Sequence, residues 1–129
     1  MRRLVTVLIP FFIISSALAA EAPALPEGAK KLKLKEIIAL LDGKTVKYTS
    51  YSHPDVWKGK TSFDFKKKKF WGTYPNKGVQ TKYKPIDLGI GTDGYCYEKA
   101  CDKGLSIYTH GKKIYEVNPD GKVNAVFTK

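Results

Sequence analysis

The chain is short of arginine, histidine and methionine, and these shortages limit what it can do. Its arginines are Arg2 and Arg3, its histidines are His53 and His110, and its one methionine is Met1. Guanidinium is the group best suited to planar, bidentate recognition of phosphate, so we expect no specific nucleic-acid binding. Both histidines stand in turn-like contexts, without a Ser-His-Asp or Cys-His pattern. We therefore predict no catalytic residues and a protein that is not an enzyme.

Cysteine is also scarce, since the chain has only Cys96 and Cys101. The CxxCH motif of c-type haem proteins is absent. Together with His53 and His110 the two cysteines would make a Cys2His2 set, but their spacing matches no zinc module. We therefore expect no metal site and no cofactor.

Long hydrophobic runs are missing except at the N-terminus. A positive start is followed by an apolar run from Leu4 to Ile14 and then by the small residues Ala17 and Ala19. This order is typical of a secretory signal peptide over residues 1–19, cut after Ala19 or Ala20. The run is too short to span a bilayer, which needs about 20 residues. We expect a periplasmic or secreted protein with no transmembrane segment after cleavage.

Export has two consequences for the mature chain. In an oxidising compartment Cys96 and Cys101 are expected to form a disulfide that closes a short loop. The remaining 21 lysines and 12 acidic residues give a formal charge of +9, which implies attraction to anionic surfaces. Residues 20–32 are predicted to be a flexible leader, and residues 33–129 a single domain, expected to be monomeric.

The periodicity of this domain changes after Gly43. Before it, apolar residues recur at helical spacing and predict one short helix from about Leu34 to Asp42. After it, apolar residues alternate with polar ones in about eight short segments separated by turn residues. The fold class is therefore mainly β: an antiparallel meander or barrel, closed or partly open, with one N-terminal helix. The expected strands are Thr45–Ser52, Thr61–Phe65, Phe70–Tyr74, Ile86–Ile90, Gly94–Glu98, Leu105–Thr109, Lys113–Val117 and Val123–Thr128.

Two motifs are better explained by turns than by known sites. The segment "GIGTDG" spells GxGxxG, but a strand-like "YCYE" follows it where a dinucleotide-binding motif needs a helix. The tripeptide "HPD" lies between strand patterns, and we interpret it as a proline turn.

Several stretches together resemble a family of small exported bacterial proteins of unknown function. They are "LPEGAKKLKLKEIIALLDGKT", an aromatic β region, "DGYCYE" and "KIYEVNPDGKV". The resemblance covers nearly the whole mature chain. It implies a lipocalin-like antiparallel fold and an envelope location, and it brings no catalytic residues.

Aromatic residues are numerous, and two interpretations of them remain open. They can simply fill a core, or they can line a pocket, since the interior of an eight-stranded barrel is just wide enough for one small ligand. The candidate pocket residues are Trp57, Trp71, Tyr74 and Tyr95.

The lysine run "FKKKKFWG" poses a similar choice. On a strand, two of Lys66, Lys67, Lys68 and Lys69 would point into the core at a high desolvation cost, so we predict a hairpin turn. The run is then either a solvated tip or an anion-binding site, helped by Lys58, Lys60, Lys82 and Lys84 if these share a face.

These observations favour an exported, non-enzymatic binding module that holds a small apolar ligand. The alternative is a lysine-driven binder of an anionic envelope polymer or lipid, and an enzyme of unknown class is the third hypothesis.

Overall fold

The structure is a computed structural model that describes residues 22–129. The expected signal peptide and its cleavage site lie outside these residues. No helix within 22–129 is long and apolar enough to cross a membrane.

The described chain is built mainly of antiparallel strands with one helix, as predicted. The elements are β1 (Lys30–Lys31), α1 (Leu34–Leu41), β2 (Thr45–Ser50), β3 (Trp57–Asp64), β4 (Lys69–Asn76), β5 (Val79–Asp87), β6 (Gly89–Ile90), β7 (Tyr95–Cys96), β8 (Ser106–His110), β9 (Lys113–Val117) and β10 (Val123–Thr128).

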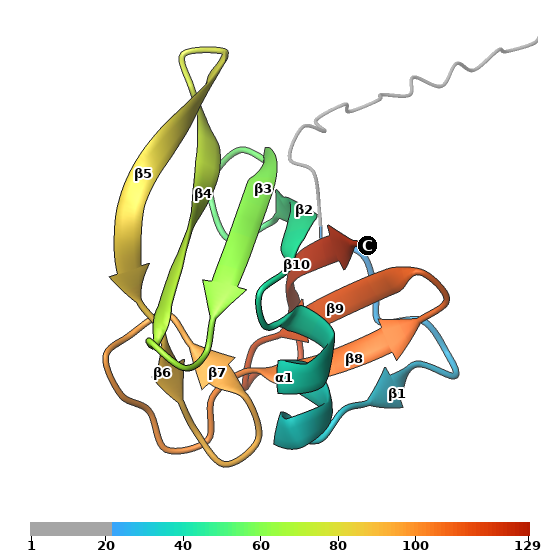
Figure 1. The fold of residues 1–129 in the computed structure, drawn as a ribbon. Coiled ribbons are helices and arrows are strands. Elements are labelled where there is room, and N and C mark those ends of the chain that lie inside the picture. The colour runs from blue at the N-terminus through green and yellow to red at the C-terminus, as the bar shows by residue number, and fades with distance from the viewer. Residues whose placement is uncertain (1–21) are drawn as a thin grey trace, which may run out of the picture.

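Eight strands form one sheet in the order β1-β8-β9-β10-β2-β3-β4-β5, and β6 and β7 form a separate hairpin. Both β1 and β5 are edges, so the sheet does not close, and of the two predicted forms, closed or partly open, the structure has the open one. After β5 the chain turns into the β6–β7 hairpin below the sheet instead of returning to pair with β1 (Figure 1). The edges are protected from further pairing because β1 is only two residues long and β5 carries Lys82, Lys84 and Pro85.

Helix α1 begins and ends almost where the sequence predicts, and it covers part of the inner face of the sheet. Ile37 and Leu41 are fully buried in the main core. The Glu36 carboxylate accepts a hydrogen bond from the Lys33 backbone N–H at 2.8 Å, which caps the first turn. Gly43 follows the helix at φ +72° and donates its N–H to the Phe63 carbonyl, which ties the end of the helix to β3.

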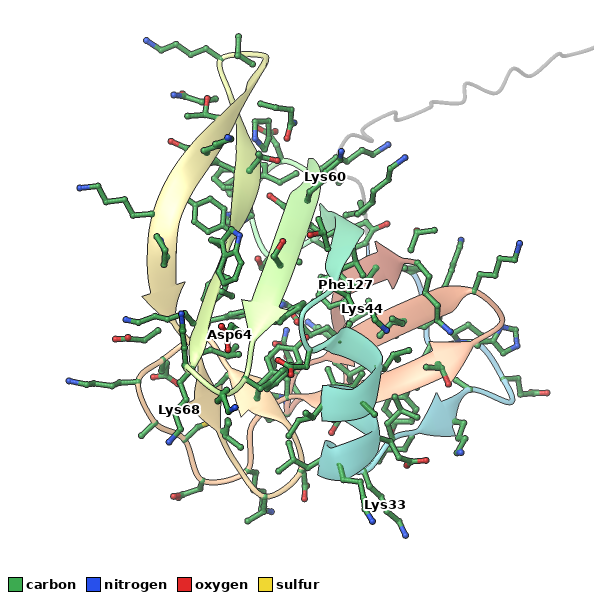
Figure 2. The ribbon with its side chains drawn as sticks, viewed as in Figure 1. Lys33, Lys44, Lys60, Asp64, Lys68 and Phe127 are labelled. Atoms are coloured by element: carbon green, nitrogen blue, oxygen red, sulfur yellow. A yellow bond between two sulfur atoms is a disulfide. The ribbon has the colours of Figure 1, made fainter. Side chains whose placement is uncertain are left out.

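The period-two pattern places alternate residues on the two faces of the sheet. Phe63, Ile107, Ile114 and Phe127 point inward to the main core beneath α1, with Phe127 at the centre of the molecule (Figure 2). A second, smaller cluster lies on the opposite face of β9 and β10, formed by Tyr115, Val117, Val123 and Val126.

The segment predicted to be a flexible leader is attached to the sheet at two points. Leu25 packs against the second cluster, and β1 pairs with β8 through Lys30 and Lys31. Residues in this segment therefore cover apolar surface of β9 and β10 that would otherwise face water.

The predicted series lacks most of one long strand, β5, and the predicted strand Ile86–Ile90 is divided in the structure between the end of β5 and β6. β5 pairs with β4 across a two-residue turn at Lys77 and Gly78, both at positive φ. Its sequence "VQTKYKPID" is too polar for a hydrophobic signal, because this part of the sheet buries little.

The loop before β7 and the loop before β8 lie against each other beside the β6–β7 hairpin, and at their contact only glycine fits. The Gly94 N–H donates to the Lys103 carbonyl, and the Leu105 N–H donates to the Tyr95 carbonyl. A Cβ on Gly104 would lie 2.3 Å from the Gly94 carbonyl oxygen, and Gly104 has a φ of +83°.

Substituting Gly104→Ala should therefore cost about 3 kcal/mol of unfolding free energy, since the backbone must move as well as accept a left-handed residue. Gly121→Ala is the matched control: φ is +89° there, but no atom lies within 4 Å of the added Cβ. It should cost only about 1 kcal/mol in the same urea titration. Equal losses in the two variants would show that the close approach of the loops contributes nothing.

Candidate functional site

The inner face of the sheet carries an open cleft of about 730 Å³ beyond the part that α1 covers. Strands β2 to β5 form one wall, and β9, β10 and the segment after β7 form the floor and the other wall. Its lining residues are Tyr48, Ser50, Ser52, His53, Trp57, Thr61, Phe70, Tyr74, Tyr83, Ile86, Cys96, Tyr97, Glu98, Leu105, Glu116, Asn118, Asn124, Ala125 and Phe127.

Stacked aromatic rings form the rim of this cleft. The imidazole of His53 stacks on Trp57 with ring centroids 3.7 Å apart and planes inclined by 16°. Trp57 in turn stacks on Tyr74 at 5.6 Å. These rings therefore give the rim a rigid, flat, apolar surface.

The ring series continues down the wall of the cleft. Tyr74 contacts Tyr83 at 6.1 Å, Tyr83 contacts Phe70 at 6.0 Å, and Phe70 contacts Tyr97 at 4.7 Å between ring centroids. All are at distances typical of favourable aromatic pairs. One wall is thus aromatic from the rim to the floor.

Strand alternation explains why these rings share a face. Phe70 and Tyr74 are both inward positions of β4, and Gly72 between them lies opposite Tyr83 of β5. Gly72 itself allows β3 to approach closely, because a Cβ there would lie 2.0 Å from the Lys60 carbonyl oxygen.

A buried carboxyl group lies beneath the floor of the cleft. Glu116 is 0% exposed and sits at an inward position of β9, opposite Ala125. Its carboxyl accepts hydrogen bonds from the hydroxyl groups of Tyr95 and Tyr97 and from the side-chain amide of Asn124. No cation is among these three partners, so hydrogen bonds alone compensate for the burial.

Burial controls the titration of this cluster. It raises the pKa of the Glu116 carboxyl, although the three hydrogen bonds partly oppose the shift. Burial also raises the pKa of the Tyr95 and Tyr97 hydroxyl groups, and the Glu116 carboxylate reinforces the effect. On the adjoining wall, burial raises the pKa of Tyr48 to about 12. Glu116 therefore keeps its proton to a higher pH than an exposed carboxyl group does, and the two hydroxyl groups also keep theirs to a higher pH than usual.

The segment that holds Tyr95 and Tyr97 is fastened by a disulfide. Cys96 lies between the two tyrosines and is bonded to Cys101, which confirms the predicted pairing. Gly89 pairs with Cys96, and a Cβ at Gly89 would lie 2.7 Å from the Cys96 sulfur. This close packing fixes both hydroxyl groups over Glu116.

The cleft differs in charge from the rest of this lysine-rich chain. Its lining includes Glu98 and Glu116, and it includes none of the lysines of residues 22–129. An anionic ligand would find no counter-charge in it, whereas a neutral ring would meet matching surfaces.

The structure places the four predicted pocket residues in three different settings. Trp57 and Tyr74 line the cleft, and Tyr95 is fully buried beneath it, where it bonds Glu116. Trp71 does not line the cleft: it pairs with Ser62 and lies 38% exposed on the other face of the sheet. Trp71 lies between Phe70 and Gly72, which are inward positions, so strand alternation points the Trp71 side chain outward.

The lysine run forms the predicted hairpin turn, at the end of β4 away from Tyr74 and the rim of the cleft. Residues 65–68 are the turn between β3 and β4, and Lys66, Lys67 and Lys68 are exposed. Lys69 is the first residue of β4, and its ammonium lies 2.7 Å from the Asp87 carboxylate. The run therefore has no part in the cleft.

Sequence reasoning missed Glu116, His53 and Asn124. Glu116 carried a usable signal, because in "KIYEV" it has the same parity as the buried Ile114 and is therefore an acid at an inward position. His53 and Asn124 have no such pattern, since they reach the cleft through a bend and a strand irregularity.

Within residues 22–129 no three His, Cys, Asp or Glu side chains are arranged to hold a metal ion. Comparisons of the chain with protein-family models, with curated proteins and with solved structures found no match.

Glu116 should make the stability of the protein depend on pH. Folding raises the Glu116 pKa above the ordinary 4.5. The free energy that protonated Glu116 contributes to the folded state is therefore fully present below pH 4.5 and is lost as the pH rises through the raised pKa. Glu116→Gln imitates the protonated form. The melting temperature of this variant, relative to that of the wild type, should therefore increase as the pH rises.

Thermal unfolding by circular dichroism across this pH range measures the difference. Glu98→Gln removes the same charge at an exposed site on the rim of the cleft and should follow the wild-type curve. Parallel curves for Glu116→Gln and the wild type would contradict the assignment of a raised pKa.

Proposed function

We propose that this protein is an exported, non-enzymatic binding module that holds a small, neutral, ring-containing molecule in the aromatic cleft. A single observation carries the proposal: an open cleft of about 730 Å³ has one continuous aromatic wall and no lysine in its lining. This volume falls within the range of about 300–1,000 Å³ that is common for small-molecule sites.

The two walls of the cleft suggest how a ligand would be held. Its apolar faces would stack against Trp57 and Tyr74 at the rim. Its few polar groups would meet Ser50, Asn118 and Asn124, which line the same cleft. A mostly apolar ring with one or two hydroxyl, carbonyl or amide groups fits this arrangement.

The periplasmic or secreted location is part of the proposal. The disulfide between Cys96 and Cys101 supports it, because such bonds persist in oxidising compartments. The N-terminal pattern of residues 1–19 points the same way.

The neutral fluorescent probe N-phenyl-1-naphthylamine tests the cleft directly. We expect it to bind the wild-type protein, and we expect Trp57→Ala to weaken binding about tenfold, because one stacking surface of the rim is removed. Trp71→Ala is the matched control, since it deletes the same side chain from the opposite face of the sheet, and it should leave the affinity within about twofold.

Equal loss in both tryptophan variants, or no binding of the probe to the wild type, would contradict the proposal.

Native mass spectrometry of protein purified from its own envelope is expected to identify the natural ligand as a co-purified mass. That mass should be absent from the Trp57→Ala protein and present in the Trp71→Ala protein.

A further inference from the structure

A row of lysines crosses the outer face of the sheet, on the side away from the cleft. Lys47 of β2 lies directly opposite Lys60 of β3. The Lys60 backbone N–H donates to the Thr73 hydroxyl at 3.2 Å, and Thr73 lies opposite Lys82 of β5. Neighbouring strands are about 4.8 Å apart, so the row runs perpendicular to the strands for about 14 Å.

Hydroxyl and amide groups lie between these ammonium groups. The lining of a groove of about 520 Å³ includes Lys47, Lys58 and Lys60 together with Thr49, Thr73 and Gln80, and Lys82 extends the row beyond this groove. The Thr73 hydroxyl already donates to Gln80 Oε1, and the Gln80 amide donates to the Lys58 carbonyl. The lysine ammonium groups, the Thr49 hydroxyl and the second amide N–H of Gln80 are the donors that remain for a ligand in the groove. Tetrahedral oxyanions such as phosphate accept hydrogen bonds from all of these groups.

The lysines of the row have no acidic partner. The ion pairs in residues 22–129 involve Lys30, Lys31 and Lys69, none of which belongs to the row. Lys47 and Lys60 are like charges at directly paired positions, an arrangement that destabilises a sheet. A bound anion would relieve this repulsion.

We propose that this row binds a linear polyanion built of repeated phosphate groups. Lysine provides mobile point charges without planar geometry, which suits a flexible chain of anions better than one fixed group. The row lies along the groove on the outer face of the sheet. A flexible chain can enter this groove, whereas a flat membrane would touch only the side chains around it.

This site is distinct from the lysine turn, and of the residues that line the groove only Tyr48 also lines the aromatic cleft. Lys60 lies near the upper end of the sheet and Lys68 at the lower turn (Figure 2). The row faces outward from β2 to β5, while the cleft opens on the inner face. Its test therefore does not depend on the proposed function of the cleft.

The test compares two triple variants of the purified protein that remove equal charge. Lys47→Gln/Lys60→Gln/Lys82→Gln removes the row, and Lys66→Gln/Lys67→Gln/Lys68→Gln removes the exposed turn lysines. Binding of end-labelled inorganic polyphosphate is measured by fluorescence anisotropy at several salt concentrations. The row variant should lose about tenfold or more in affinity, and the slope of log Kd against log salt should fall by about 2, whereas the turn variant should lose less than about threefold.

Three results would overturn the proposal. The first is equal weakening in both variants, which would indicate net charge alone. The second is orthophosphate binding as tightly as polyphosphate, which would indicate a single-anion site. The third is an unchanged polyphosphate affinity in the row variant, even if binding to phosphatidylglycerol vesicles is lost. The melting temperature of the row variant should not fall, because a like-charge pair is removed, so misfolding would not obscure the result.

Discussion

The organisation of the molecule depends on the hydrogen bonds that one buried carboxyl group receives. Glu116 lies at an inward position of β9 and is hydrogen-bonded by Asn124 from β10 and by Tyr95 and Tyr97 from the β7 segment. A carboxyl left without these donors would cost several kilocalories per mole, so the hairpin and the sheet must keep their relative positions. The floor of the cleft therefore depends on this contact, and the disulfide beside the two tyrosines limits how far it can open.

The same strands carry two different chemistries on their two faces. On β4, Phe70 and Tyr74 point into the apolar cleft, while Trp71 and Thr73 point outward. On β2, Tyr48 lines the cleft and its neighbour Lys47 joins the outer lysine row. Strand pleating therefore places the proposed site for a neutral molecule and the proposed site for an anionic chain on opposite faces of one open sheet, with Tyr48 lining both hollows.

Local patterns predicted the parts of the fold that depend on neighbouring residues in the chain. The helical spacing before Gly43 and the turn at the lysine run both appear where the sequence placed them. Strand β5 could not be predicted, because its residues alternate without a clear apolar face. Closure of the barrel could not be judged either, because it depends on where the two edge strands lie, and that is decided by contacts distant in sequence.

The sequence alone determined the mainly β class, the short helix and the pairing of Cys96 with Cys101. The first two follow from residue periodicity, and the disulfide follows from the presence of only two cysteines in a chain whose N-terminus has the pattern of a signal peptide. The tertiary structure alone decided which aromatic residues share a surface, so that Trp57 lines the cleft while Trp71 lies on the opposite face. It also decided which lysines stand side by side, because strand register, a long-range property of the sheet, sets both arrangements.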